Sequence, residues 1–136
     1  MKNILLVDDE PLILQTLKEL LDLHSGDFKV LTAENGRQAS GILAYAPVDL
    51  VITDLNMPEM DGFQLLAFMA GAYPHIPAIA MSAAADGEAY EKLRVLGVSR
   101  FVGKPFSFSE LMGLIRSCFA EGPRTYSDSI ATGLAL

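Results

Sequence analysis

Short aliphatic runs alternate along this chain with longer segments of helical period, and this alternation restricts the possible folds most strongly. The runs span residues 3–7, 28–33, 50–53, 78–81 and 100–102. Each is short, largely apolar and bounded by turn residues, as buried strands are. Strands that alternate with helices favour a parallel sheet covered on both faces. We therefore predict an α/β fold, a (βα)5 doubly wound five-stranded parallel sheet.

The segments between and after these runs carry apolar residues three, four and seven positions apart, which predicts helices. The first four stripes are Ile13, Leu17, Leu20 and Leu21; Ala39, Ile42, Leu43 and Ala46; Leu65, Leu66 and Met69; and Tyr90, Leu93 and Leu96. The fourth helix, over residues 88–96, has the fewest apolar anchors. The fifth helix begins at Ser107 and Glu110, which have capping-box spacing, and it continues to Cys118.

The composition suits one folded domain and excludes several classes of partner. Of 136 residues, 51% are hydrophobic, and the formal net charge is −7. An acidic chain without Lys and Arg clusters is a poor ligand for nucleic acid. The single cysteine, Cys118, forms no disulfide within the chain, and we expect it in the core. The apolar run near the N-terminus is too short to insert in a membrane, so we expect a cytoplasmic protein.

The domain boundary is predicted near the end of the last helix. Gly122 and Pro123 break the helical pattern, and the residues that follow are small and polar with a few scattered aliphatic ones. We predict a folded domain over residues 1–120 and a flexible tail over residues 121–136.

Acidic residues follow two of the predicted strands directly. Asp8, Asp9 and Glu10 come after the first strand, and Asp54 comes after the third. In a doubly wound sheet, sites form at the carboxyl ends of the strands, where the strand order reverses. If the order is 2-1-3-4-5, the first and third strands are neighbours, and their carboxylates meet in one crevice.

The last two strands bring further polar groups to the same edge. The fourth ends next to Ser82, a hydroxyl, and the fifth ends next to Lys104, a cation. Two like charges 4 Å apart repel by about 4 kcal/mol at an effective dielectric of 20, so clustered carboxylates need a counter-charge. Mg²⁺ fits best, because it takes oxygen ligands and leaves positions open for a phosphate. His24 and His75 lie at predicted loop positions facing away, which disfavours zinc.

Each of these residues alone also has a simpler interpretation. Asp9 or Glu10 could cap the first helix, Asp54 with Asn56 could form an Asx turn, Ser82 could hydrogen-bond locally, and Lys104 could be a solvated surface residue. These interpretations do not explain why polar groups stand at successive strand ends. Glu59 and Asp61 we assign only to a turn and a helix cap.

The motifs "LLVDDE", "VITDLNMPEMDG", "AMSA" and "FVGKPF" occur in this order over residues 2–120. In this the chain resembles the receiver domain of two-component response regulators, most closely the single-domain type found among chemotaxis regulators. The resemblance implies a flavodoxin-like fold with strand order 2-1-3-4-5. It also implies partners: a sensor histidine kinase or phosphotransfer protein upstream, and a target protein bound through the fourth helix, fifth strand and fifth helix, with a homodimer possible through the same surface.

The resemblance further implies roles for the matching acidic residues. Asp54 would be the phosphoacceptor, receiving a phosphoryl group from phosphohistidine or from a small donor such as acetyl phosphate. Asp9 and Asp54 would hold Mg²⁺ through their side chains, with Asp8 acting through water. Asn56 would add its backbone carbonyl.

The remaining motif residues would form the switch. Lys104 would pair with the phosphoryl oxygens, and Ser82 would hydrogen-bond to one of them after phosphorylation. Phe101 stands at the aromatic switch position, where many members have tyrosine, and the Lys104–Pro105 peptide bond would be cis. Ala84, two residues past Ser82, is small enough to leave water access to the phosphoryl group.

Two other functions remain open at this point. A small Mg²⁺-dependent aspartyl-phosphate phosphatase would use Asp54 as its nucleophile, but such enzymes usually have a second acid where Asn56 stands. A receiver-like interaction module would never accept phosphate, and the complete set of motif residues disfavours it. We therefore expect a signalling domain rather than a turnover enzyme.

Overall fold

The computed structural model describes residues 1–24, 27–83 and 87–121. Five strands alternate with five helices: β1 (Lys2–Val7), α1 (Pro11–Leu23), β2 (Phe28–Ala33), α2 (Gly36–Tyr45), β3 (Leu50–Asp54), α3 (Gly62–Ala72), β4 (Ala78–Ser82), α4 (Gly87–Val95), β5 (Arg100–Gly103) and α5 (Phe108–Glu121). The predicted (βα)5 fold class is confirmed. Helix α5 extends one residue into the predicted tail, and residues 122–136 of that tail lie outside the described residues.

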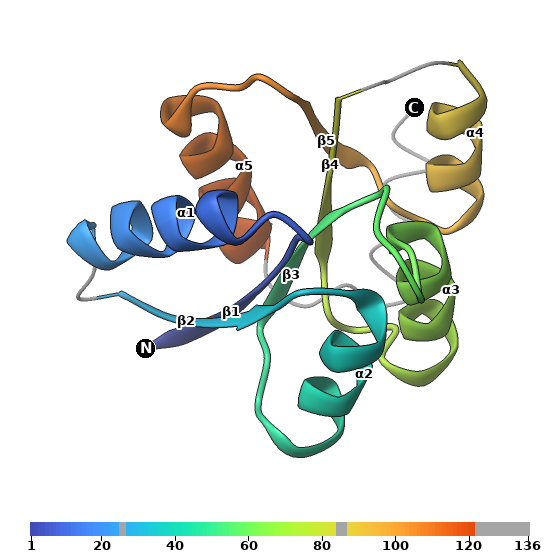
Figure 1. The fold of residues 1–136 in the computed structure, drawn as a ribbon, viewed down its shortest axis with the longest axis horizontal. Helices are drawn as coiled ribbons and strands as arrows, with labels where there is room; N and C mark the ends of the chain where they lie inside the picture. The colour runs from blue at the N-terminus through green and yellow to red at the C-terminus, as the bar shows by residue number, and fades with distance from the viewer. Residues whose placement is uncertain (25–26, 84–86, 122–136) are drawn as a thin grey trace.

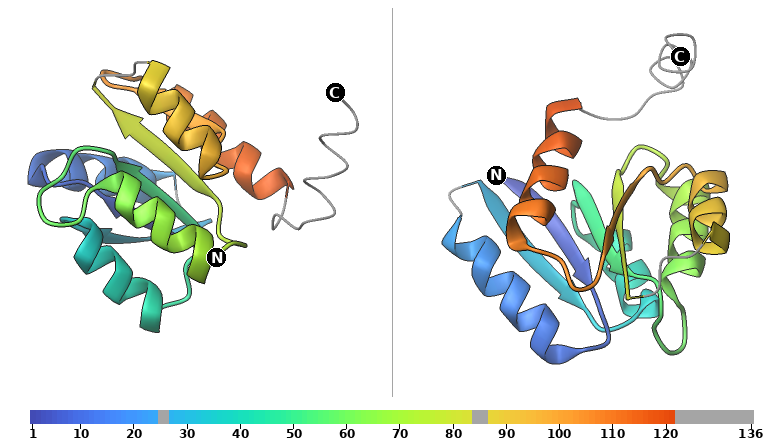
Figure 2. Two further views of the ribbon diagram at one scale, coloured as in Figure 1. Left: turned by 90° about the vertical axis from the view of Figure 1, so that its right-hand side faces the viewer. Right: turned by 90° about the horizontal axis from the view of Figure 1, so that it is seen from above.

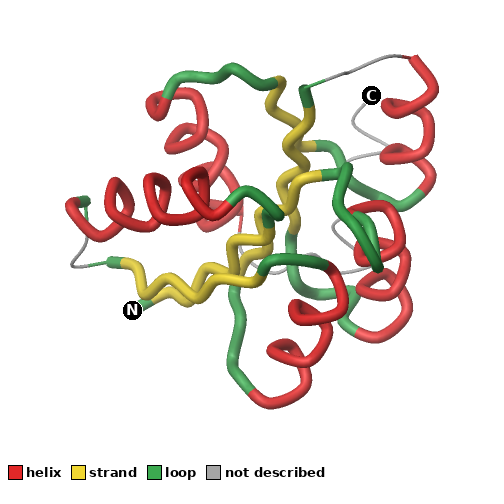
Figure 3. Tube along the Cα trace, viewed as in Figure 1, coloured by secondary structure: helices red, strands yellow, loops and turns green. Residues whose placement is uncertain are grey.

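The five strands form one parallel sheet in the order β2-β1-β3-β4-β5, as predicted. Figure 1 shows the sheet running through the centre of the molecule, and Figure 3 marks the loops that join it to the helices. Val7 stands opposite Thr53, and Asp54 stands opposite Met81. This register places the carboxyl ends of β1, β3 and β4 side by side at one edge.

Side chains alternate between two hydrophobic cores, one on each face of the sheet. In β1, Ile4 and Leu6 pack with α1 and α5, whereas Leu5 and Val7 pack with α2, α3 and α4. Figure 2 shows from two further directions how these two groups of helices cover opposite faces. Because both faces are covered, the inner strands β3 and β4 are buried over nearly their whole length, whereas the edge strand β2 alternates between buried and more exposed residues.

Helix α1 is rotated slightly from the predicted stripe. Its buried residues are Leu14, Leu17 and Leu21, whereas Ile13 and Leu20 are only partly buried. Five apolar residues cover more than one helical face, so packing against the sheet decides which row becomes central. The half-buried row borders an apolar cavity between α1 and the segment after β5.

Helix α4 has fewer buried anchor residues than predicted. Leu93 is 2% exposed and serves as an anchor, but Tyr90 is 51% exposed and does not. Cys118 is buried in the core of the α5 side, as expected. Within the described ranges, every helix is too short or too polar to cross a membrane.

Candidate functional site

The strand order brings the predicted site residues to one edge of the sheet. Asp8 directly follows β1, Asp54 is the last residue of β3, and Ser82 is the last residue of β4. Lys104 follows β5, and its backbone N–H donates to the carbonyl of Ser82 at 2.7 Å. Four strand ends therefore meet at this edge of the sheet.

The acids form a compact cluster at this edge. Asp8, Asp9 and Asp54 each present a carboxylate oxygen, and these oxygens lie within 4.8 Å of one another. Asp8 is fully buried and Asp54 is 6% exposed, while Asp9 is open to solvent. Buried carboxylates at this separation repel one another unless a cation compensates them.

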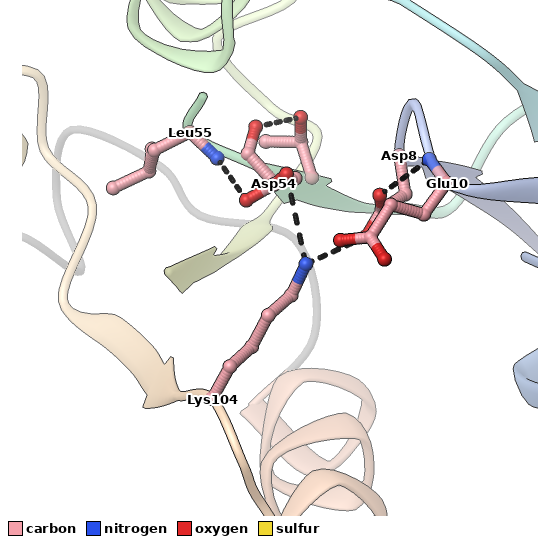
Figure 4. Close-up of polar contacts among 6 residues, drawn as sticks. Asp8, Glu10, Asp54, Leu55 and Lys104 are labelled. Carbon is pink, nitrogen blue, oxygen red and sulfur yellow. Dashed lines mark hydrogen bonds and ion pairs between the residues drawn. The ribbon is translucent and has the colours of Figure 1, made fainter. Parts of the chain in front are cut away.

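Lys104 supplies part of that compensation. Its Nζ donates to Oδ2 of Asp8 at 2.8 Å and lies 3.6 Å from Oδ2 of Asp54 (Figure 4). Burial acts to lower the pKa of Lys104, but its hydrogen bond to Asp8, together with the charges of Asp8, Asp54 and Glu10, outweighs burial and raises this pKa. The lysine therefore stays protonated beside Asp8 and Asp54.

The two carboxylate oxygens of Asp54 have different surroundings. Oδ1 accepts the backbone N–H of Leu55 at 2.9 Å, whereas Oδ2 faces Lys104. Burial raises the pKa of Asp54, and the charge of Lys104 only partly offsets this. One oxygen is thus held by the backbone, while the other lies among the acids and the lysine.

The other residues named from the sequence differ in where they lie relative to this cluster. Ser82 is 1% exposed at the end of β4, and Asn56 is exposed just after Asp54. The Lys104–Pro105 peptide bond is cis. Ala84 lies outside the described residues. His24 and His75 are exposed and do not belong to the acid cluster.

The structure adds a positioning residue that sequence reasoning missed. A Cβ on Gly62 would lie 2.1 Å from the carbonyl oxygen of Asp54 and 2.7 Å from the Cα of Leu55. The N–H of Gly62 donates to the carbonyl of Leu55 at 3.1 Å, and the Asp61 side chain forms a capping box with Gln64. The start of α3 thus touches the backbone of Asp54, and the Asp-Gly pair was the only signal of this contact.

Sequence reasoning also missed the partner of the aromatic residue on β5. Phe101 is partly buried, and the ring of Tyr90 meets it edge-on, with centroids 5.0 Å apart. Tyr90 was predicted only as an anchor of its helix, because sequence spacing does not show which residues of β5 face α4.

The comparisons with known proteins agree with this geometry. The family model of the response regulator receiver domain matches residues 4–116, which is most of the chain. The chain belongs to this family. Receiver domains are signalling domains of two-component systems, in which they interact with histidine kinases and downstream effectors.

Individual relatives support the assignment to the receiver family. Response regulator GtcR of Aneurinibacillus migulanus is 38% identical over 118 residues, which cover 85% of this chain and 47% of that protein. The chain spans less than two thirds of the length of curated relatives such as GtcR.

Solved structures agree with the fold of this receiver domain. The signal receiver domain of an HD domain-containing protein from Pseudomonas fluorescens Pf-5 has a TM-score of 0.82 and 32% identity, covering 88% of this chain and 95% of that one. Chemotaxis protein CheY4 of Vibrio cholerae has a TM-score of 0.80 and 27% identity, covering 88% and 99%.

Proposed function

We propose that this receiver domain accepts a phosphoryl group on Asp54 and thereby carries a signal in a two-component phosphorelay. The observation that carries the proposal is the position of Asp54 at the end of β3, with Oδ2 facing Lys104 and the carboxylates of Asp8 and Asp9 close by. A nucleophilic carboxylate beside a fixed cation suits phosphoryl transfer, which depends on positioning and on neutralised charge.

The reaction needs no proton from Asp54. An ionised oxygen of Asp54 attacks phosphorus, a new P–O bond forms, and the bond from phosphorus to the histidine nitrogen of the donor breaks. The electron pair stays on that nitrogen, and the imidazole leaves as a neutral ring because its other nitrogen carries a proton. Lys104, which stays protonated, would pair with the phosphoryl oxygens, and the hydroxyl of Ser82 would hydrogen-bond to one of them.

The acid cluster suits Mg²⁺. Asp8, Asp9 and Asp54 offer the oxygen ligands that this ion prefers, and we assign the backbone carbonyl of Asn56 to the same set. When bound, Mg²⁺ supplies charge neutralisation to the transferring phosphoryl group. The half-open cluster, with Asp9 exposed, leaves room for the water ligands that Mg²⁺ retains.

The output lies on the surface of α4, β5 and α5. Phosphorylation would recruit Ser82 toward the phosphoryl group and shift the population of Phe101 orientations, which changes this surface for a target protein or a second copy of the chain. Phe101 has no hydroxyl, but Tyr90, whose ring meets it edge-on, has one and is half exposed. We place the protein in the cytoplasm, with a sensor histidine kinase or phosphotransfer protein as donor.

Incubation with acetyl phosphate and Mg²⁺, followed by intact-mass measurement, tests the proposal. We expect one phosphoryl adduct on the wild type and none on Asp54→Ala. Repeated turnover of many phosphoesters would indicate a phosphatase instead. No adduct with any donor would indicate a module that acts by binding alone, and would refute the phosphoacceptor role.

A further inference from the structure

A polar cavity of about 230 Å³ opens beside the phosphorylation site, on the α4 side. It is lined by Leu55, Asn56, Phe63, Ser82, Glu88, Ala89 and Lys92. Asn56 and Ser82 connect it to the end of β3 and to the end of β4, where the phosphoryl group would bind. Helix α4 forms the far wall, and none of the motif residues lies on this helix.

Lys92 is the cation among the described residues that line this cavity. Its Nζ lies 5.1 Å from the ring centroid of Phe63 and 3.5 Å from Oε1 of Glu88. The contact with Phe63 holds the amine against the cavity wall. The pair with Glu88 is exposed, at 56% and 78%, so exchanging Glu88 for another carboxylate costs little free energy.

A second cavity beside the site differs in chemistry. It measures about 560 Å³ and lies between α1 and the segment after β5, where its wall is almost entirely apolar apart from Lys104 and Thr16. An apolar surface of this size suits a protein, whereas a small anion gains nothing from it. The polar cavity at Lys92 is therefore the better place for a small charged donor.

We propose that Lys92 stabilises the leaving group when an acyl phosphate phosphorylates Asp54, and so favours such donors over those whose leaving group is neutral. The inference rests on the proposed function. In the reaction, an oxygen of Asp54 attacks phosphorus, and the P–O bond to the acyl group breaks. The acyl group departs as a carboxylate that keeps the electron pair and needs no proton. A cation at Lys92 stabilises that departing charge.

The nature of the leaving group gives a sharp test, because phosphoramidate, which reacts with its nitrogen protonated, releases neutral ammonia from the same transfer. We would measure phosphorylation rates against donor concentration with Mg²⁺, for acetyl phosphate and for phosphoramidate. The chain has no tryptophan, so the readout is intact mass or a phosphate-affinity gel. Four proteins suffice: wild type, Lys92→Gln, Lys92→Arg and the matched control Arg94→Gln.

Arg94→Gln is a suitable control because this substitution removes the same charge from the same helix as Lys92→Gln. Arg94 pairs with Glu91 at 2.6 Å, and it does not line the cavity. Lys92→Gln should slow phosphorylation by acetyl phosphate about two- to fivefold, the size of one solvent-exposed charge interaction. It should leave the rate with phosphoramidate nearly unchanged. Lys92→Arg should keep a phosphorylation rate with acetyl phosphate close to that of the wild type. Arg94→Gln should change the rates with the two donors by the same factor.

The outcomes separate this inference from the phosphoacceptor role. Equal slowing of both donors by Lys92→Gln, or no slowing of either, overturns the role of Lys92 while Asp54 remains the acceptor. Phosphorylation of the wild type by phosphoramidate but not by acetyl phosphate does the same. Failure of both donors on the wild type overturns the phosphoacceptor role itself. Raising the ionic strength should shrink the Lys92 effect, because salt screens exposed charges.

Discussion

At the scale of single residues, Gly62 has no room for a side chain. A Cβ there would overlap the carbonyl oxygen of Asp54 and approach the backbone of Leu55, neither of which can move aside as a flexible side chain would. We predict that Gly62→Ala lowers the free energy of unfolding by about 2 kcal/mol, the usual cost of overpacking, and slows phosphorylation of Asp54 by displacing it. Urea denaturation and intact-mass kinetics measure the two effects.

Gly71 provides the matched control for this prediction, because it lies in the same helix and a Cβ there meets nothing within 4 Å. Gly71→Ala should raise the free energy of unfolding by roughly 0.5–1 kcal/mol, since alanine loses less backbone entropy in a helix. If Gly62→Ala were also stabilising and fully phosphorylated, the contact between α3 and Asp54 would not constrain the site.

The buried carboxylate of Asp54 should make stability depend on pH. Because burial raises its pKa, the folded protein binds this proton more tightly than the unfolded chain does, so folded stability falls as pH rises from the ordinary aspartate value of 3.8 through the raised one. At neutral pH without Mg²⁺, Asp54→Asn should therefore be more stable than wild type, and the difference should vanish toward pH 3.8. The raised pKa of Lys104 adds no slope in this window, since its contribution is lost only above 10.5.

Urea denaturation in EDTA at several pH values measures this difference. Asp22→Asn is the control, because this substitution removes the same charge. Asp22 is an exposed residue of α1, remote from the strand ends. A lower stability of Asp54→Asn than of wild type at pH 7 would mean that the attraction of Lys104 outweighs burial.

At the scale of elements, α4 stands apart from the other helices. Among its described residues only Leu93 is buried, whereas α1, α2 and α3 each bury three or more. Few buried apolar contacts allow local opening. We predict that amide hydrogens of α4 exchange faster than those of α1 and α3, and that a beryllofluoride mimic of the phosphoryl group with Mg²⁺ slows them. Mass-spectrometric hydrogen exchange measures both, and equal protection of all helices would contradict the prediction.

The elements also show how far sequence reasoning reaches. The order of strands and the meeting of Asp8, Asp54 and Lys104 could be predicted, because parallel strands end at one edge and each site residue adjoins a strand end. The contact of Tyr90 with Phe101 and that of Lys92 with Phe63 could not. Both depend on how α4 is rotated against its neighbours, and a helix with one buried residue carries almost no periodic signal for that rotation.

At the scale of the whole molecule, a chain with net charge −7 brings three of its 17 acidic residues together at one edge of the sheet, and two of these three carboxylates are buried. An ion that binds only the folded state stabilises it by mass action, by about 2.7 kcal/mol at a hundredfold excess over its dissociation constant. We predict that Mg²⁺ raises the melting temperature of the whole domain, beyond the effect of NaCl at equal ionic strength.

A variant of Asp9 distinguishes stabilisation by an ion bound at the cluster from stabilisation by general screening of charge. The carboxylate of Asp9 is exposed and its loss should hardly disturb folding, whereas Asp8 accepts the hydrogen bond of Lys104, and its loss would leave Lys104 with the longer ion pair to Asp54 at 3.6 Å. Asp9→Asn should therefore fold normally yet lose most of the Mg²⁺-dependent rise in melting temperature. Glu19→Gln, which removes an exposed charge from α1, should keep that rise. Equal responses of both variants would show that Mg²⁺ acts only through the overall charge of the domain, because an ion bound at the cluster requires the charged carboxylate of Asp9 and a diffuse ion atmosphere does not.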